Sequence, residues 1–438
     1  MKLESNSPQA QWARRDFLKL SAAGALGLAF AQLPTFAAPL TRADFEKLVP
    51  SDKKLSPEWV KSLFERGKPE VLRGEELKFV GMPVGGIGAG QLYLGGDGRL
   101  WHWDIFNQFI FTGAEHYAKP MIPSSPLVQK FSLKFGDKVV SLDRDGFSDV
   151  SFRGEYPIGV VNYADTNVPL TVKLEAFSPF IPLNTDDSSL PATVFQFTVK
   201  NTSAAPIEAT LTGEVENGVC LHHRKRSGVL NNRFVNAKGA TMLLCSAVGD
   251  TDINKLPDFG TMSLALLGDA DATSGDKSAA FNEKLIGSLG RKLALAAGES
   301  KTVTFILTWH FPNLSLKDSF TDCGRFYATK FSSAQAVAEY VTENFSRLEG
   351  QTKLWRDTWY DSTLPWWLLD RLFMPVSILA SATCQWRKDG RFWAWEGVRC
   401  CPGTCAHVWN YEHSMARLFP ELERSVREMQ DFGPGFVE

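Results

Sequence analysis

The sequence predicts a large antiparallel β-sandwich followed by the first helices of an incomplete α-helical domain. Apolar and polar residues alternate with a period of two from about Leu77 to Trp309, which is typical of strands with one face in a core and one in water. The alternation is clearest at 131–135, 172–176, 195–199, 207–211 and 303–309. Gly, Pro, Asn and Asp separate these segments and supply the turns of antiparallel sheets. After residues 310–313 the period changes to that of helices.

Helices are expected in the C-terminal part of the chain. Residues 334–345 have helical spacing, and the apolar stretch 366–386 is expected to be a helix kinked at Pro375. A helical stripe between 415 and 429 is interrupted by Pro420, which can open a second helix because the N–H it lacks would be unpaired there anyway. Apolar helical stripes need a packing partner, so we expect the sequence to stop before the helical domain is complete.

Length and composition narrow the class of protein. A chain of 438 residues suggests two or three domains, and 44% hydrophobic with 22% charged residues is typical of a globular protein. The formal net charge of −2 gives no electrostatic footprint for nucleic acid or for an anionic membrane surface. No nucleic-acid partner is therefore expected.

Tryptophan is concentrated in one region. Eight of the 13 Trp lie between Trp355 and Trp409. An indole combines a large apolar face with one N–H donor, so it suits the C–H faces of sugar rings as well as protein cores. For any single Trp core packing is the better explanation, but the clustering favours a sugar site.

The N-terminus has the order of an export signal. Arg14 and Arg15 are followed by Phe-Leu-Lys, an apolar run over 20–30 and small residues up to Ala38. Paired arginines in this context are typical of a twin-arginine signal, an address for proteins exported in the folded state. The apolar run is shorter than the ~20 residues that span a bilayer, so no stable membrane anchor is expected after cleavage. The mature protein is expected to be periplasmic or secreted.

The cysteines do not predict a disulfide framework or a metal site. There are seven, and four of them lack a neighbour at metal-type spacing. Cys400, Cys401 and Cys405 are close enough to bind a metal or form one bridge, but no second ligand pair follows, so buried thiols that line a turn are the favoured interpretation. No metal and no other cofactor is expected.

Two further motifs have ordinary explanations. The glycine-rich segment 85–90 is followed by the strand-like segment 91–94 and by no Lys-Ser/Thr pair, so we expect tight backbone packing at a strand start and no nucleotide loop. His222 and His223 would point to opposite faces of a strand and could not easily share a metal, so a solvated loop is expected.

The segment 392–397 is a stronger candidate for chemistry. Glu396 stands alone among aromatic residues and beside Gly397, ahead of a predicted helix. Apolar surroundings raise a carboxyl pKa while nearby donors lower it, and glycosidases use this balance to separate the roles of two carboxylates. The alternative is a surface glutamate near a helix start.

Trp395-Glu396-Gly397, with Thr404 and His407 after it, resembles the start of the catalytic domain of glycoside hydrolase family 116, the group that contains non-lysosomal glucosylceramidase. Further stretches that resemble the family are 85–88, 99–104, 177–182, 187–191, 309–313 and 419–423. The resemblance runs from about residue 75 to 438. It implies a β-sandwich joined to an (α/α)6 barrel and an enzyme that hydrolyses β-glycosides with retention of configuration. The implied substrate is a β-glucoside, either a glycolipid or an oligosaccharide.

The resemblance also implies roles for single residues. Glu396 takes the position of the nucleophile, and Trp395, Thr404, His407 and Trp409 those of substrate-binding residues. His407 stands where relatives usually place an Asp that contacts the sugar, which leaves the glycone open. Retaining enzymes use two carboxyl groups ~5 Å apart. The acid/base Asp of the family is expected downstream of the chain's last residue, so this chain alone is expected to be inactive.

The domain boundaries that follow are a signal peptide over 1–38, an N-terminal extension over 39–74, the β-sandwich over 75–313, a helical linker over 314–365 and the beginning of the (α/α)6 domain over 366–438. An alternative function of a different class stays open. The chain would then be a non-catalytic β-sandwich that binds carbohydrate or a protein partner, with its helical tail docked on another subunit.

Overall fold

The computed structural model describes residues 55–108, 124–250, 252–315, 323–395, 397, 403–404 and 415–433. The chain divides into two compact units, Met1–Ser62 and Leu63–Glu438. In the first unit the described element is α3 (Pro57–Ser62). All that follows concerns the second unit.

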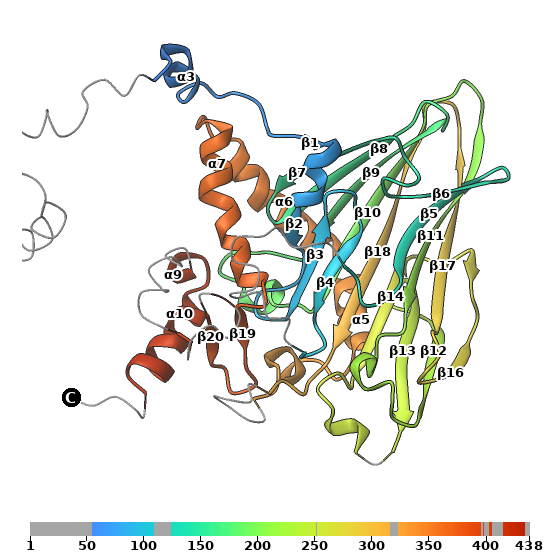
Figure 1. Ribbon diagram of the computed structural model, residues 1–438, viewed down its shortest axis with the longest axis vertical. Coiled ribbons are helices and arrows are strands. Elements are labelled where there is room, and N and C mark those ends of the chain that lie inside the picture. The colour runs from blue at the N-terminus through green and yellow to red at the C-terminus, as the bar shows by residue number, and fades with distance from the viewer. Residues whose placement is uncertain are drawn as a thin grey trace, which may run out of the picture. The chain divides into compact units, whose positions relative to one another are not determined.

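Antiparallel sheets dominate the second unit (Figure 1). The ten-stranded sheet has, in spatial order, β1 (Leu72–Arg73), β7 (Asp149–Glu155), β8 (Ile158–Ala164), β9 (Leu170–Phe177), β10 (Ala192–Asn201), β18 (Ser300–His310), β14 (Thr261–Leu267), β13 (Ala240–Gly249), β12 (Gly228–Ala237) and β16 (Lys277–Ala280). The five-stranded sheet has β15 (Ala272–Thr273), β17 (Ile286–Leu295), β11 (Ile207–Glu216), β5 (Gln129–Phe135) and β6 (Lys138–Ser141). A smaller sheet contains β2 (Gly81–Pro83), β3 (Gln91–Gly95) and β4 (Leu100–Asp104).

Aromatic side chains join the two large sheets. The ring of Phe131 on β5 lies 5.1 Å from that of Phe195, 4.6 Å from that of Phe197 and 5.2 Å from that of Phe305, between ring centroids. The last three residues belong to β10 and β18 of the ten-stranded sheet. All four are buried, as the period-two alternation requires for the inward face of each strand. The prediction of a large antiparallel β-sandwich followed by helices is confirmed.

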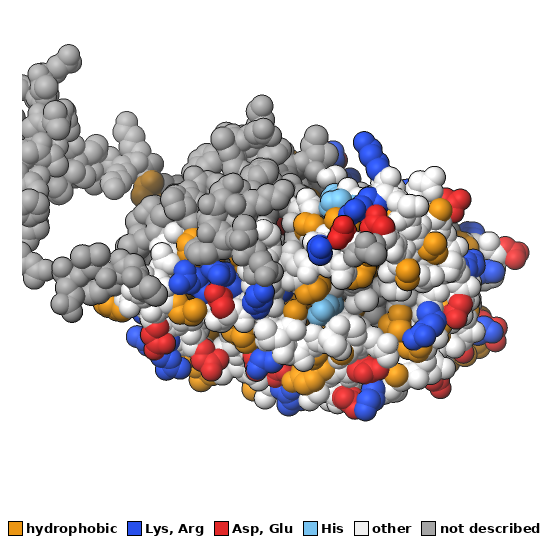
Figure 2. All heavy atoms as spheres, turned by 90° about the horizontal axis from the view of Figure 1, so that it is seen from below, with side chains coloured by type: hydrophobic (Ala, Val, Ile, Leu, Met, Phe, Trp, Pro, Cys, Tyr) orange, Lys and Arg blue, Asp and Glu red, His pale blue; other side chains and the backbone are white. Residues whose placement is uncertain are grey.

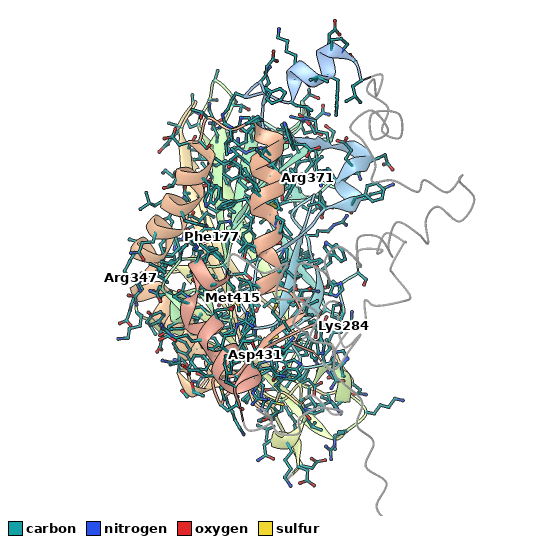
Figure 3. The ribbon with its side chains drawn as sticks, turned by 90° about the vertical axis from the view of Figure 1, so that its left-hand side faces the viewer. Phe177, Lys284, Arg347, Arg371, Met415 and Asp431 are labelled. Atoms are coloured by element: carbon teal, nitrogen blue, oxygen red, sulfur yellow. The ribbon has the colours of Figure 1, made fainter. Side chains whose placement is uncertain are left out.

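Two helices cover the outer face of the ten-stranded sheet. They are α5 (Ala334–Glu343), which begins after the N-cap Ser333 at the predicted residue, and α6 (Phe345–Tyr360). Buried residues of both helices pack in one cluster with Phe177 on β9 and with other residues of this face. In Figure 3 the helices that carry Arg347, Arg371, Met415 and Asp431 lie in front of the strands that include Phe177.

The apolar stretch 366–386 differs from its prediction. It forms α7 (Trp366–Phe373) and a 3-10 helix, η5 (Met374–Ala380), but then a strand, β19 (Cys384–Trp386), which pairs with β20 (Phe392–Ala394). The helical prediction for 384–386 is therefore wrong, because a short apolar run has the same appearance in a buried strand as in a buried helix. The change from α to 3-10 geometry coincides with Pro375, which has no N–H to donate.

The C-terminal helices follow the predicted pattern. Pro420 stands at the first position of α10 (Pro420–Val426), directly after α9 (Met415–Leu418), and a π-helical turn, η6 (Arg427–Asp431), continues it. Short elements elsewhere are η1 (Gly74–Phe79), α4 (Thr185–Ser188), η2 (Leu221–His223), η3 (Ile253–Lys255) and η4 (Phe326–Thr329).

The described surface mixes both signs of charge. On the face in Figure 2, Lys and Arg side chains alternate with Asp and Glu over the described atoms. None of the helices in the described part of the chain is long and apolar enough to cross a membrane.

Candidate functional site

The β19–β20 hairpin leads directly into the proposed site. Gln385 lies opposite Trp393, and the pairing ends at Cys384 and Ala394. Beyond it the Trp395 amide donates to the carbonyl of Thr383 at 2.9 Å. Trp395 is buried, with 3% of its surface exposed. The residue before Glu396 is thus fixed by backbone and by packing.

The chain returns to the end of strand β20 ten residues after Ala394. The Thr404 amide donates to the carbonyl of Ala394 at 2.6 Å, and Thr404 is buried. Gly403 has φ +96, and a Cβ there would lie 2.3 Å from Nε1 of Trp393, so only glycine fits at this return. The structure therefore brings together two of the predicted substrate-binding residues, Trp395 and Thr404, at the base of the segment that contains Glu396.

The other predicted site residues lie outside the described part of the chain. They are Glu396, His407 and Trp409. Cys400, Cys401 and Cys405 lie outside it as well. Their predicted roles stay predictions.

Arg325 lies under the hairpin and joins it to the sandwich. Its side chain is fully buried. Nε donates to Oδ1 of Asn107 at 2.9 Å, and Nη1 donates to the carbonyl of Gly88 at 3.3 Å and to Oε1 of Gln385. Gln385 in turn donates from Nε2 to the carbonyl of Ala382 at 2.8 Å. One guanidinium therefore connects the end of the β3–β4 region, the glycine-rich turn and strand β19.

The Arg325 guanidinium lies in a buried environment. Burial lowers the pKa of Arg325, and the nearby buried Asp104 offsets only part of this effect. Arginine stays protonated in proteins, so a fixed positive charge lies beneath the hairpin. Burial also raises the pKa of Tyr327 to about 12, so its hydroxyl stays neutral and donates to the carbonyl of Phe311 at 2.9 Å. No sequence motif marks Arg325, Asn107 or Gln385, and sequence reasoning missed them.

The glycine-rich turn contacts the hairpin directly. Gly88 donates to the carbonyl of Leu379 at 2.9 Å and accepts from the Trp386 amide at 3.2 Å. Its φ is +64, and a Cβ there would lie 2.8 Å from Cβ of Trp386. The Trp386 ring stacks on Phe326 with centroids 3.5 Å apart. The prediction of tight backbone packing, in place of a nucleotide loop, is confirmed.

The opposite side of the hairpin contacts α10. The Ser425 hydroxyl donates to the carbonyl of Gly390 at 2.6 Å and accepts from the Phe392 amide at 3.3 Å. Nη2 of Arg391 donates to the carbonyl of Met429 at 2.7 Å. The hairpin is therefore held between the sandwich and the C-terminal helices.

His222 is exposed, as expected of a solvated segment, but the half-buried His223 has a buried partner that was not predicted. Nδ1 of His223 lies 2.7 Å from Oδ1 of Asp258, whose carboxyl is fully buried, and the His222 amide donates to Oδ2 of the same group at 2.7 Å. The residues form a 3-10 turn and not a strand. Asp258 is distant in sequence, so the pattern gave no sign of this partner.

The described cysteines are Cys220, Cys245, Cys323 and Cys384. All four are buried, and no disulfide joins any two of them. Among the residues that the structure describes, no group of three His, Cys, Asp or Glu side chains has the arrangement of a metal site.

Residues 81–267 and 260–348 match a family described as beta-glucosidase 2, glycosyl-hydrolase family 116, N-terminal. The chain belongs to this family. The family-116 match covers the sandwich from β2 onward, α5 and the first turn of α6, and it ends before the β19–β20 hairpin. Membership of family 116 is therefore established by the β-sandwich domain, against which the β19–β20 hairpin packs.

Solved structures resemble the chain weakly. A protein described as a kojibiose phosphorylase from the human microbiome has a TM-score of 0.39 at 10% identity, over 68% of this chain and 39% of that one. An aldose 1-epimerase-like protein from Klebsiella pneumoniae has a TM-score of 0.28 at 9% identity, over 60% of this chain and 80% of that one. An α-galactosidase from Geobacillus stearothermophilus has 0.25 at 8%, over 55% and 41%.

Gly88→Ala is expected to destabilise the protein by at least about 2 kcal/mol more than Gly239→Ala, because it adds a clash with Trp386 to the backbone strain. Gly239 has φ +79 and open space within 4 Å of the position that a Cβ would take, so Gly239→Ala isolates the strain of about 1 kcal/mol. Urea unfolding of both variants and the parent measures the difference. Equal destabilisation by the two substitutions would contradict the close packing of Gly88 against the hairpin.

Proposed function

We propose that this chain supplies the β-sandwich and the nucleophile of an exported retaining β-glycosidase. The observation that carries the proposal is the fixed hairpin of a family-116 chain, which places Trp395 and Thr404 at the two ends of the segment that contains Glu396. A nucleophile must be held in a reactive geometry, and a site on rigid, packed elements meets this requirement. The proposed substrate is a β-glucoside, with a lipid or a sugar as the aglycone.

The proposed reaction has two steps. In the first, the carboxylate of Glu396 attacks the anomeric carbon, the bond to the aglycone oxygen breaks, and a second carboxyl group protonates that oxygen. In the second, the same group removes a proton from water, whose oxygen attacks the anomeric carbon and releases Glu396. The configuration at the anomeric carbon is retained because it is inverted twice.

Residues near Glu396 in the sequence are proposed to form the sugar-binding site. The Thr404 hydroxyl oxygen is buried and has no hydrogen-bond partner among the described residues, so it can bond a substrate hydroxyl or the nucleophile. Trp395 is buried against Leu314, Cys323 and Trp393, so its proposed part in substrate binding is to support the base of the sugar site. His407 and Trp409 complete the proposed contacts, and His407 in place of the usual Asp is the residue on which the choice of glycone would depend.

The general acid is assigned by family resemblance to an Asp of the helical domain downstream of these elements. General acid catalysis contributes about 10²–10⁴-fold for a poor leaving group. Residues 39–438 alone are therefore expected to show no useful turnover of unactivated glycosides. A good leaving group needs no protonation, so covalent trapping of Glu396 remains possible.

A 2-deoxy-2-fluoro-β-glucoside with a dinitrophenolate leaving group is expected to label Glu396, because the fluorine slows the second step and the leaving group departs unprotonated. Peptide mass spectrometry after incubation of the protein isolated from its source, and of residues 39–438, locates the label. Glu396→Gln should abolish labelling, while Glu421→Gln, a change to an exposed carboxylate of α10, should leave it intact.

Two outcomes would contradict the proposal. Label on a carboxylate other than Glu396 would assign the nucleophile elsewhere. A source protein that takes up no label would favour the alternative of a non-catalytic carbohydrate- or partner-binding sandwich.

We also propose export through the twin-arginine route. The support is the order of Arg14, Arg15, the short apolar run and the small residues up to Ala38. Replacing both arginines by lysine should retain the uncleaved protein in the cytoplasm, as measured by cell fractionation and N-terminal sequencing. Unchanged export of that variant would refute the assignment.

A further inference from the structure

A strap of residues 63–71 precedes β1 and holds the start of α7 at one edge of the ten-stranded sheet (Figure 1). The Trp366 amide donates to the carbonyl of Arg66 at 3.0 Å, and Nε1 of Trp367 donates to the carbonyl of Leu63 at 3.1 Å. The chain after the strap forms β1, which pairs with β7. The strap is therefore bonded to α7 at one end and continues into the sheet at the other.

Arg66 of the strap binds the end of α6. Nη1 donates to the carbonyl of Leu364 at 2.6 Å, and Nη2 donates to the carbonyl of Tyr360 at 2.6 Å. The guanidinium lies 4.3 Å from the centroid of the Trp366 ring, and this ring stacks on Tyr360 with centroids 5.1 Å apart. A cation and two stacked rings thus attach the strap to both helices.

A small cavity of about 130 Å³ lies where the strap, β7 and α7 meet. Among the described residues, three carboxyl groups line it, Glu70 of the strap, Glu155 of β7 and Asp370 of α7. Glu155 is 4% exposed, Asp370 is half-buried and Glu70 is exposed. Ionised carboxylates repel one another, so the contact between the three elements is opposed when all three groups are charged.

The Glu155 carboxyl group has two arginine neighbours. Nη2 of Arg153 lies 2.8 Å from Oε2, and Nε of Arg356 on α6 lies 3.9 Å from the same oxygen. Arg356 is shared, because its Nη1 also lies 3.7 Å from Oε1 of Glu175. Burial raises the pKa of Glu155, the two arginines offset part of this rise, and the charge of Asp370 adds to it.

The Asp370 carboxyl group is bonded to the end of α6, where the Tyr360 hydroxyl donates to Oδ1 at 3.2 Å. Burial raises the pKa of Asp370 and the charge of Glu70 raises it further, while the Tyr360 hydroxyl and Arg371 lower it. Burial also raises the pKa of Tyr360, so its hydroxyl stays protonated and remains a donor. Glu155 and Asp370 therefore both keep a proton to higher pH than carboxyl groups in water.

The raised pKa values favour the closed junction in acid. A carboxyl group that keeps its proton to higher pH in the closed form than in the open form stabilises the closed form below its ordinary pKa of about 4. This stabilisation is lost as the pH rises through the raised value, because the closed form then contains a partly buried charge. The strap and α7 are therefore bound most tightly in acid.

From this geometry we propose that the junction of the strap, β7 and α7 is a pH-sensitive joint, which closes when its carboxyl groups are protonated and loosens when they ionise. α7 continues through η5 into β19, so the joint sets how firmly the segment before the β19–β20 hairpin is attached to the sheet. Neither Trp395 nor Thr404 lines the cavity, and the joint does not depend on the proposed role of Glu396.

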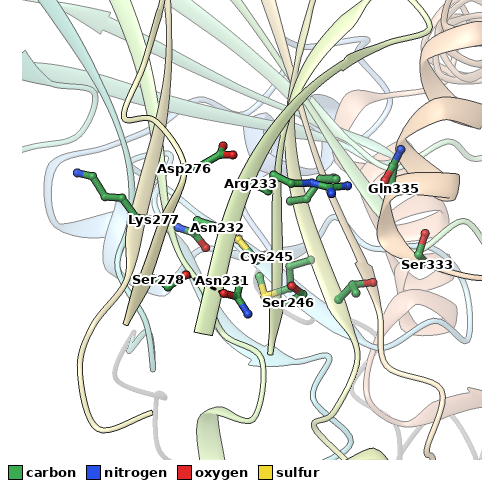
Figure 4. Close-up of a pocket in the computed structure, with 13 residues that line it drawn as sticks. Asn231, Asn232, Arg233, Cys245, Ser246, Asp276, Lys277, Ser278, Ser333 and Gln335 are labelled. Atoms are coloured by element: carbon green, nitrogen blue, oxygen red, sulfur yellow. Dashed lines mark hydrogen bonds between the residues drawn. The ribbon is translucent and has the colours of Figure 1, made fainter. Parts of the chain in front are cut away.

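The opposite edge of the ten-stranded sheet provides a matched control. β16 is the last strand there, and Asp276, directly before it, lines a hollow of about 650 Å³ (Figure 4). Asp276 is exposed, and its Oδ1 accepts from the Phe234 amide at 2.8 Å. Asp276→Asn therefore removes one carboxylate charge from the sheet without touching the joint.

The test measures amide hydrogen exchange of the full chain from about pH 4 to about pH 7, with each rate compared with the intrinsic rate at the same pH. The Trp366 amide reports on the strap through its bond to Arg66. We expect its protection factor to fall about tenfold or more over this range, and to fall less in Asp370→Asn and in Glu155→Gln. Asp276→Asn should show the same fall as the parent, and strand β10 should keep its protection.

A protection factor of the Trp366 amide that does not change with pH would overturn the proposal. An equal fall in the parent, Asp370→Asn and Glu155→Gln would overturn it as well, because the carboxyl groups would then not be the cause. A fall that includes β10 would show global unfolding and has the same consequence. If neither variant folds, as judged by circular dichroism, Glu70→Gln takes their place and should reduce the fall, because Glu70 raises the pKa of Asp370.

Discussion

The burial of one guanidinium constrains the site more than any other interaction in the described structure. A buried arginine is tolerated only where acceptors surround it, and those of Arg325 come from segments far apart in sequence, at Gly88, Asn107 and Gln385. Its Nη1 bonds to Gly88 and Gln385 tie β19 to the sandwich, while Nη2 has no hydrogen-bond partner among the described residues. The strand that pairs with β19 then runs straight into the segment of the proposed nucleophile.

The sandwich of this family-116 chain thus holds the β19–β20 hairpin, which leads into the proposed site. Gly88 approaches the backbone and Cβ of Trp386 without a side chain between them, and the ring of Phe326 stacks on the Trp386 indole. On the far side, Ser425 of α10 bonds the turn of the hairpin at Gly390 and strand β20 at Phe392. The proposed chemistry beside the β19–β20 hairpin therefore depends on contacts that the hairpin makes with the β domain.

Much of this architecture could be predicted from local patterns. The alternation around Phe131, Phe197 and Phe305 identified strands whose inward faces do meet between the sheets. The helix after Ser333 and the break at Pro420 followed from capping and proline chemistry. Local signals of this kind depend on a few neighbouring residues, so they can be recognised in a single sequence.

The remaining features depend on contacts between distant residues. The strand over 384–386 could not be told from a helix, because its pairing with 392–394 and its position against Gly88 decide the conformation. Arg325 and Asp258 are ordinary charged residues in the sequence, and only folding surrounds them with partners. The glycine-rich turn and the segment of Glu396 are separate motifs in the sequence. Nothing in the sequence showed that the turn packs against the hairpin that precedes Glu396.

Amide hydrogen exchange in an Arg325→Met variant tests most directly whether the buried guanidinium holds the hairpin on the sandwich. The account predicts that the Trp395 and Thr404 amides exchange at least about tenfold faster than in the parent, while strand β10 keeps its protection. Unchanged exchange at Trp395 and Thr404, or uniform acceleration that includes β10, would contradict it.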